Sequence, residues 1–362
     1  YGGPPANLSR LAKTEALMQK PRQQKRKQHL LLLLILVLLL LLILPALALG
    51  SSDLGLREIV AALINGGDAG VQQIVLGIRL PRVLAALMAG AALSISGAVI
   101  QTVIRNPLGS PYTLGLSAAS MFGAALAIVM LGHWARQAQL GMLANNPWLI
   151  SASAFLFGLL CALFITGIAR WRGASPETLI MAGIIISALF GSATSLLQYL
   201  SDDVELAAIV SWMFGDLGKA TPQNVRIMAL ALLPALLWFL ANTFPLSTLH
   251  AGDEVAASLG VRVNRLRMLS VVVASLITAV TVAFFGVIAF VGLIIPHITR
   301  RLLGFGEGVV LTGSALLGAL FLLASDLLAR TLVAPVVLPV GIITSFVGAP
   351  FFLYLLFHRL PK

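Results

Sequence analysis

The chain contains 362 residues, of which 59% are hydrophobic and only 10% are charged, and 24 lysines and arginines against 13 acidic residues give a formal net charge of +11. Because a typical soluble domain carries about 25% charged residues, this composition excludes an ordinary water-soluble fold. The single cysteine, Cys161, excludes an intrachain disulfide, and its apolar surroundings predict a buried packing role.

Long apolar stretches separate the few charged residues. A helix that crosses a bilayer needs about 20 mostly apolar residues, since it rises about 1.5 Å per residue through a core about 30 Å thick. The spacing therefore predicts an all-α, polytopic membrane protein with about ten transmembrane helices. These predicted helices span residues 29–49, 71–104, 112–132, 147–170, 177–200, 222–243, 266–285, 287–301, 307–333 and 340–358.

Residues 1–28 form a basic segment directly before the first apolar stretch. A basic run in this position is typical of a cytoplasmic anchor that sets orientation, and it can contact anionic lipid headgroups. We therefore predict a poorly ordered cytoplasmic tail over 1–28, no nucleic-acid partner, and one transmembrane domain over 29–362. Residues 30–49 also resemble a signal peptide, but a retained first helix is favoured because all that follows is membrane-embedded as well.

The remaining basic residues support an orientation with both termini in the cytoplasm. With the N-terminus inside, most lysines and arginines fall in cytoplasmic loops, as the positive-inside rule requires. An even number of helices then returns the C-terminus to the same side.

Two of the predicted helices have informative small residues. In the second helix, Ala86, Gly90, Ser94 and Ala98 recur every four residues, a spacing that lets another helix approach closely. The uncharged stretch from 268 to 299 is too long for one crossing, so we divide it at Gly286, where glycine weakens a helix.

Motifs for nucleotide hydrolysis, metal binding and covalent catalysis are missing. The residue after Lys219 is Ala220 rather than Ser or Thr, so no phosphate-binding loop forms there. The five histidines lack metal-ligand spacing. We therefore expect a protein that is not an enzyme by itself and binds no metal or cofactor. The intramembrane charges are Asp326 and Arg330, which can pair at i, i+4; an ion-coupled secondary transporter is the alternative class, although it would usually carry more buried acids.

The loop between the sixth and seventh predicted helices, about 250–267, contains a short amphipathic pattern. Asp253 and Glu254 open it, where acids suit a helix N-terminus. Val255 and Leu259 follow at an interval of four, and Gly260 permits a break. Such a helix can dock into a groove of a soluble partner; the alternative is a solvated connector.

Ordered motifs from about residue 70 to 358 resemble the permeases of ATP-binding-cassette (ABC) importers for iron-siderophore, haem or vitamin B12, the FecCD type. The motifs are Arg79-Leu-Pro-Arg82, Gly90–Gly97, Gln101, Arg105–Gly115, Trp212–Gly215, Phe285–His297 with Arg300, Asp326–Arg330, Leu338–Gly341 and Gly348–Phe351.

The resemblance implies a homodimer in the bacterial inner membrane, two ABC ATPase subunits that bind ATP and Mg, and a periplasmic or lipid-anchored substrate-binding protein. By the same resemblance, Arg79, Arg82 and Arg330 receive acidic residues of the binding protein, for which guanidinium groups are suited. The alternative is that Arg330 only neutralises Asp326 and that Arg79 and Arg82 extend to the membrane interface.

The resemblance also implies residues for coupling and gating. ATPase coupling is expected at Gly252, Asp253, Glu254, Ala257, Leu259 and Gly260. A cytoplasmic gate is expected at Asn106, Leu108 and, with a poorer match because Pro176 and Glu177 replace small polar residues, Ser175. The expected function is import of a metal chelate by alternating access. A ferric siderophore is the favoured substrate, with haem and vitamin B12 as alternatives.

Overall fold

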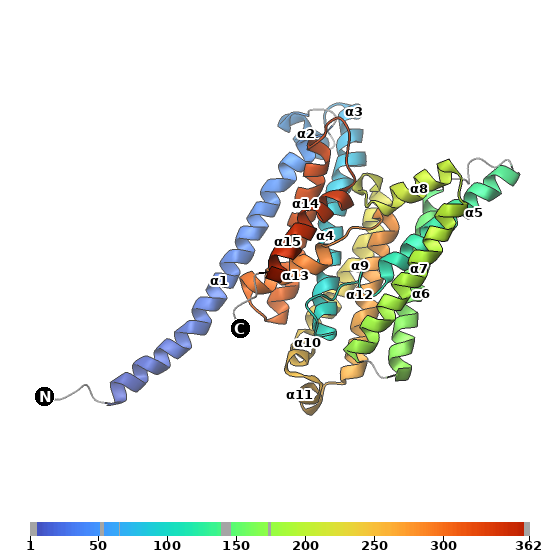
Figure 1. The fold of residues 1–362 in the computed structure, drawn as a ribbon. Coiled ribbons are helices and arrows are strands. Elements are labelled where there is room, and N and C mark those ends of the chain that lie inside the picture. Colours follow the sequence, from blue (N-terminus) through green and yellow to red (C-terminus); the bar gives the residue numbers. More distant parts are fainter. Residues whose placement is uncertain (1–5, 51–53, 65, 139–145, 173–174, 358–362) are drawn as a thin grey trace.

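The computed structural model describes residues 6–50, 54–64, 66–138, 146–172 and 175–357, and within these ranges every regular element is helical. The long helices form one bundle, from which the N-terminal part of α1 extends outwards, and short helices lie at both ends of the bundle (Figure 1). The long helices are α1 (Ala6–Ala48), α4 (Leu80–Val103), α5 (Leu116–Ala138), α6 (Pro147–Arg172), α7 (Pro176–Leu200), α9 (Pro222–Ala241), α12 (Val263–Phe285), α14 (Glu307–Thr331) and α15 (Val340–Phe357).

The shorter elements cap or connect these helices. They are α2 (Leu56–Leu63), α3 (Ala69–Gln72), the π-helical η1 (Gln73–Arg79), α8 (Asp203–Met213), the 3₁₀ turn η3 (Leu217–Lys219), α10 (Thr243–Thr248), the 3₁₀ turn η4 (Leu249–Ala251), α11 (Asp253–Ser258) and α13 (Val291–Leu303). Helices α2 and α3 mark one end of the bundle and α11 marks the other (Figure 1). We call these the α3 end and the α11 end.

Each of the ten predicted crossings coincides with a helix, but their lengths differ. By length and composition, eight helices in the described chain can cross a membrane: α1, the continuous run of α3, η1 and α4, and α5, α6, α7, α9, α12 and α14. The other two are shorter, since α13 has 13 residues and the apolar part of α15 is Val340–Tyr354. Helix α1 begins at Ala6 and has no break at the predicted tail boundary, residue 28.

Small residues let α4 lie at the centre of the bundle. The predicted stripe Ala86, Gly90, Ser94 and Ala98 is buried, as expected for a packing face. A Cβ atom at Gly90 would lie 2.2 Å from the carbonyl oxygen of Gly318 in α14. Here glycine is required because any side chain would force the two helices apart.

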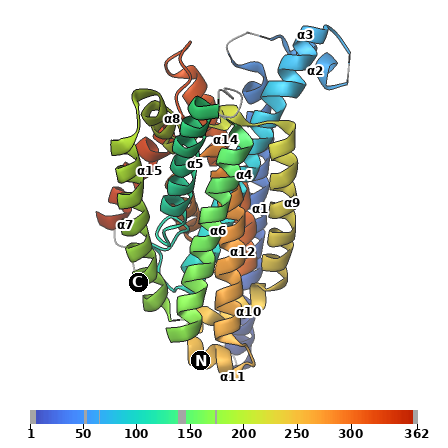
Figure 2. The ribbon, with the colours of Figure 1, turned by 90° about the vertical axis from the view of Figure 1, so that its right-hand side faces the viewer.

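A second group of helices, α6, α9 and α12, forms one side of the molecule (Figure 2). Helix α12 packs extensively against α6 and also against α9, whereas α6 and α9 have at most marginal contact with each other. In Figure 2, α12 lies between the other two. Helix α12 therefore separates α6 from α9 on this side of the bundle.

Candidate functional site

The predicted docking arginines lie where α1 ends, at the α3 end of the bundle. Arg79 closes the π-helical turn η1 and is only 5% exposed. Its Nη1 donates hydrogen bonds to the carbonyl oxygens of Leu47 (2.7 Å) and Ala48 (2.6 Å). These carbonyls belong to the last turn of α1 and have no partner within the helix. Arg79 therefore satisfies the C-terminus of α1, where a cation is also favoured by the helix dipole.

Asp326 joins the other two arginines in a buried cluster. Its carboxylate has no solvent exposure; it accepts hydrogen bonds from Arg82 Nε at 2.9 and 3.2 Å and lies 3.1 Å from Arg330 Nε. Arg330 Nη1 also donates to the carbonyl oxygens of Ala46 and Leu49, each at 3.1 Å. The cluster thus ties α1, α4 and α14 together.

This geometry agrees with the alternative in which Arg330 neutralises Asp326. The side chains of Arg330 and Arg82 are 5% and 13% exposed. Arg82 is therefore the better placed of the two to meet a protein outside the bundle. The described chain brings the three predicted arginines together, and a structural role accounts for most of their contacts.

The predicted coupling segment is a compact turn at the α11 end. Asp253, the first residue of α11, accepts hydrogen bonds from Arg267 Nη2 at 2.9 and 3.1 Å and lies 3.5 Å from Arg105 Nη2. Arg267 is 1% exposed, and its Nε donates to the carbonyl oxygen of Val103 at 2.8 Å. Asp253 and Arg267 therefore connect α11 to the end of α4.

The opposite face of α11 is available to a partner. Val255 and Leu259 are 46% and 56% exposed, and Glu254 and Ala257 are exposed beside them. Gly252 and Gly260 bracket the helix with φ angles of 106° and 83°, a backbone conformation that glycine adopts without strain. The predicted amphipathic helix is thus present, with its apolar side chains on the surface.

A second polar contact in this region was not predicted. The Glu307 carboxylate is fully buried at the start of α14; its Oε1 lies 2.6 Å from His250 Nε2 and accepts a hydrogen bond from Thr102 Oγ1 at 2.8 Å. Arg300 Nη2 lies 3.8 Å from the same oxygen. His250 precedes α11, so this contact fastens the coupling segment to α4 and α14. The sequence places Glu307 in the first turn of a predicted helix, which was the only signal for this contact. It did not identify His250 as the partner, because His250 is 57 positions away.

The predicted gate residues lie on an irregular segment and at a helix start. The chain from 104 to 115, between α4 and α5, is not helical. Within it, Asn106 Oδ1 accepts a hydrogen bond from the Leu108 backbone N–H at 2.9 Å, and the Leu108 side chain is 50% exposed. Ser175 Oγ accepts from the Thr178 N–H and so caps α7.

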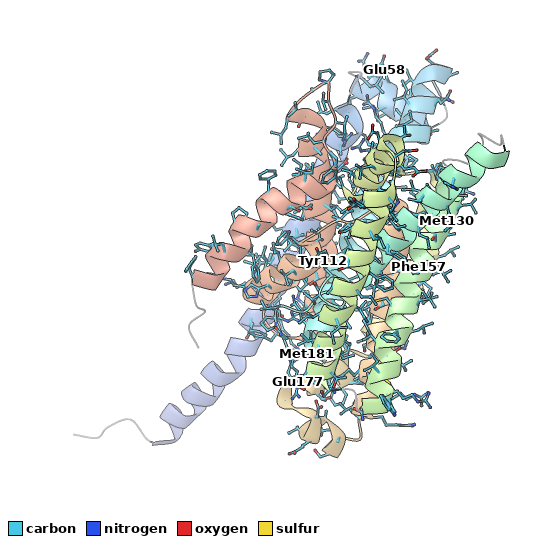
Figure 3. The ribbon with its side chains drawn as sticks, turned by 45° about the vertical axis from the view of Figure 1, so that its right-hand side comes forward. Glu58, Tyr112, Met130, Phe157, Glu177 and Met181 are labelled. Atoms are coloured by element: carbon cyan, nitrogen blue, oxygen red, sulfur yellow. The ribbon has the colours of Figure 1, made fainter. Side chains whose placement is uncertain are left out.

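Ser175 and Asn106 belong to the same end of the molecule. Glu177, two residues after Ser175, interacts electrostatically with Arg105 and Arg267. Figure 3 places Glu177 near the α11 end and Tyr112, from the irregular segment, deeper in the bundle. The segment between α4 and α5 therefore runs from the coupling region towards the interior.

Two irregular segments meet at the first turn of α15, which contains Gly341. Gly215 N–H donates to the Val287 carbonyl at 3.0 Å, and Gly341 N–H donates to the Gly215 carbonyl at 3.1 Å. The predicted break at Gly286 is confirmed: α12 ends there, and Gly286 and Phe290 have φ angles of 72° and 67°. Non-helical backbone at membrane depth occurs only where it is buried in protein or lines a cavity.

These segments line a hollow of about 600 Å³. Its lining is mostly apolar and includes no charged side chain: Tyr112, Met121, Met213, Phe214, Val287, Ala289, Gly341, Ile342, Ser345, Phe346, Ala349 and Pro350. In secondary transporters, interrupted helices typically form the substrate site; the same kind of backbone surrounds this hollow. Among the described residues, no group of His, Cys, Asp and Glu could hold a metal ion.

Comparisons with known proteins agree with this arrangement. The chain is 46% identical to the ABC transporter permease protein MJ0087 of Methanocaldococcus jannaschii over 86% of this chain and 89% of that protein. It is 36% identical to the hemin transport system permease protein HmuU of Yersinia pestis, over 87% and 93%. It is 31% identical to the vitamin B12 import system permease protein BtuC of Vibrio vulnificus, over 86% and 90%.

The fold is also that of a solved structure, described as an inward-facing conformation of a metal-chelate type ABC transporter. The TM-score is 0.79 at 31% identity, over 90% of this chain and 98% of the other. Residues 36–358 match the FecCD transport family. The chain therefore belongs to the FecCD transport family and is a multi-pass membrane permease of the ABC transporter type.

Proposed function

We propose that this permease imports a metal chelate, with a ferric siderophore as the favoured cargo, and that the hollow beside α15 is part of its path. The observation that carries the proposal is the hollow itself, because interrupted helices surround it and no charged side chain lines it. A bare ferric or divalent ion would require oxygen, nitrogen or sulfur ligands at fixed positions. A chelate brings its own ligands and needs only apolar and weakly polar contacts.

The same chelate class includes the cargo of the relatives. One is named for hemin and another for vitamin B12, and both are alternative cargoes here. Tyr112, Met121 and Met213 in the hollow are residue types that can approach haem iron, so haem is the second candidate. A siderophore is favoured because its iron is already fully enclosed.

The proposed assembly is a homodimer with two ABC ATPases and a substrate-binding protein. The ATPases, which bind ATP and Mg, contact the exposed face of α11 and place that end, with both termini, in the cytoplasm. The binding protein docks at the α3 end, where Arg82 is the more exposed partner of Asp326. ATPase closure would move α11, and Asp253 and His250 would pass that movement to α4 and α14. Alternating access then follows if the two permease states bind the ATPases differently.

Uptake into proteoliposomes tests the proposal. The complex of permease, ATPases and binding protein would be offered labelled ferric siderophore, haem or cobalamin, with and without ATP on the ATPase side. We expect ATP-dependent uptake of the siderophore. Uptake of haem or cobalamin, and not of the siderophore, would make that compound the cargo in place of the siderophore. Uptake driven by an ion gradient without ATP would refute the mechanism.

A further inference from the structure

A second hollow lies between α6, α8, α9 and α12. Its volume is about 510 Å³, and it shares no lining residue with the hollow beside α15. Helix α12 starts next to α11 and runs away from it, so the end of α12 that lines this hollow lies towards the α3 end. The lining residues are Ile128, Pro147, Trp148, Ile150, Ser151, Ala208, Ser211, Trp212, Lys219, Thr221, Gln223, Asn224 and Phe284.

The mouth of this hollow favours an anion. Lys219 lines it, and no described carboxylate lies within ion-pair distance of its ammonium group. Burial lowers the pKa of Lys219, and nearby Asp216 partly opposes that shift. Helix α9, which has 20 residues, starts here with its N-cap Thr221. Pro222, the first residue of α9, has no N–H, and the Asn224 N–H already binds Thr221 Oγ1. The ammonium group of Lys219 therefore supplies the attraction for an anion, and the positive end of the α9 dipole adds to it.

An apolar extension leads from this mouth into the membrane-spanning part of the bundle. A neighbouring cavity of about 200 Å³ shares Trp148, Ser151 and Phe284 with the first and adds Ala152, Phe155, Ile227, Val280 and Ala283. The rings of Trp148 and Phe284 meet edge to face at 6.1 Å where the two cavities join. Phe155 lies about 10 Å farther along α6 than Trp148, and Val280 lies one turn farther from the α3 end than Phe284.

The extension is open to the side of the molecule. Residues of α6, α9 and α12 line it, and Figure 2 shows α12 between α6 and α9. Trp148 and Ile227, on opposite walls, are 47% and 37% exposed. In a membrane this cavity faces acyl chains. Trp148 lines the part of it nearest the α3 end, and tryptophan is typical of the membrane interface. A cationic mouth above an apolar groove matches an amphiphile with an anionic headgroup.

We propose that this groove binds one anionic phospholipid, with its phosphate at Lys219, beside the start of α9, and one acyl chain along Phe155, Ile227, Val280 and Phe284. A free phosphate would leave the apolar extension unused. A soluble chelate would have to enter from the bilayer. Binding by itself does not depend on the proposed cargo. The site could still influence transport, because Phe284 lies two residues before the irregular segment that lines the path.

Native mass spectrometry of the purified chain tests the site. The probes are phosphatidylglycerol, zwitterionic phosphatidylcholine and inorganic phosphate. Lys219→Gln removes the charge, and Arg57→Gln on α2 is the matched control, since Arg57 is exposed at the same end. We expect Lys219→Gln to weaken phosphatidylglycerol binding roughly tenfold, as loss of one charge-assisted contact does, with little change for phosphatidylcholine or in Arg57→Gln.

A second variant tests the acyl groove without removing charge. Ala152→Phe fills the extension from an exposed position, and Ala207→Phe on α8 adds the same bulk at an exposed residue outside both cavities. Ala152→Phe alone should reduce retained lipid. Unchanged lipid binding in both Lys219→Gln and Ala152→Phe would overturn the site. If inorganic phosphate displaced the lipid and Ala152→Phe had no effect, the hollow would be a simple anion site. That result would overturn the lipid assignment.

Discussion

At the scale of single residues, the most consequential feature is the buried carboxylate of Asp326. Two arginines from α4 and α14 neutralise it, and one of them also binds the last carbonyls of α1. Charges are tolerated at such depth only when they are paired and hydrogen-bonded. The cluster therefore stabilises the meeting point of three helices, whether or not it also contacts a binding protein.

Asp326→Asn should strongly destabilise the permease, because it leaves the guanidinium groups of Arg82 and Arg330 buried without a counter-charge. Removing one partner of a buried pair typically costs about 3–5 kcal/mol. Thermal unfolding of the purified chain in detergent measures the effect. The control is Asp203→Asn, the same change at an exposed residue of α8. A melting temperature lowered no more than in the control would contradict the structural role.

Part of this cluster could be predicted from the sequence. The i, i+4 spacing of Asp326 and Arg330 predicted their pairing, and the structure has it at 3.1 Å. Arg82 could not be assigned to the same carboxylate, because it is 244 positions away and only the packing of α4 on α14 brings them together. The contact between His250 and Glu307 was missed for the same reason. Local spacing predicts local pairs, whereas buried networks require the tertiary arrangement.

At the scale of helices, close approach of α4 to its neighbours organises the bundle. A Cβ atom at Gly97 would lie 1.7 Å from the carbonyl oxygen of Gly292 in α13, and one at Gly90 would meet α14. Both obstacles are backbone atoms, so no rotamer change can relieve them. Helix α4 can therefore be surrounded by neighbours only because it has glycine at these points.

Gly97→Ala should force α4 and α13 apart and destabilise the chain. Overpacking of this kind costs about 1–3 kcal/mol. Gly191→Ala is the matched control, because Gly191 lies in α7 and has no atom within 4 Å of its hypothetical Cβ; there the better helix propensity of alanine should be neutral or favourable. Melting temperatures of the two variants in the same detergent provide the comparison. Equal effects would show that the close approach is dispensable.

The second helix-scale feature is the attachment of α11. If α11 receives the ATPases, Asp253→Asn should uncouple the complex, because it removes the ion pairs with Arg267 and Arg105 while leaving the exposed face of α11 unchanged. We expect normal ATPase co-purification and uptake reduced several-fold. Glu254→Gln, the same change on the exposed side, should affect association more than coupling. Full uptake by Asp253→Asn would contradict this assignment.

Helix positions were largely predictable, and helix interruptions only in part. The apolar stretches located the eight helices that are long and apolar enough to cross a membrane, because bilayer thickness sets a minimum apolar length. Gly286 predicted one break, since glycine weakens helices. Residues 105–111 were predicted as a connection, but the irregular course continues to residue 115. The convergence of Gly215, Val287 and Gly341 was not predicted. Their backbone groups are satisfied by contacts between distant segments, which leave no local pattern in the sequence.

At the scale of the whole molecule, the coupling region at the α11 end and the hollow beside α15 are connected by the segment after α4 and by α12. The irregular segment after α4 extends from the coupling region at Arg105 to Tyr112 in the hollow, and α12 extends from Arg267 to the break at Gly286. A displacement of α11 would therefore reach the wall of the hollow through this irregular segment and through α12. The proposed homodimer would place the hollows of two copies on either side of one central path.

Cross-linking tests this dimer arrangement. Cys161 is the only cysteine, so Cys161→Ala supplies a thiol-free background. Phe346→Cys on α15 introduces a thiol at a 77% exposed position that lines the hollow, and Leu237→Cys introduces one at a 67% exposed position on α9. With a short bismaleimide in native membranes, we expect a cross-linked dimer from Phe346→Cys and none from Leu237→Cys. The α9 face should instead contact lipid, so the reverse pattern would place the central path on the other side of the molecule.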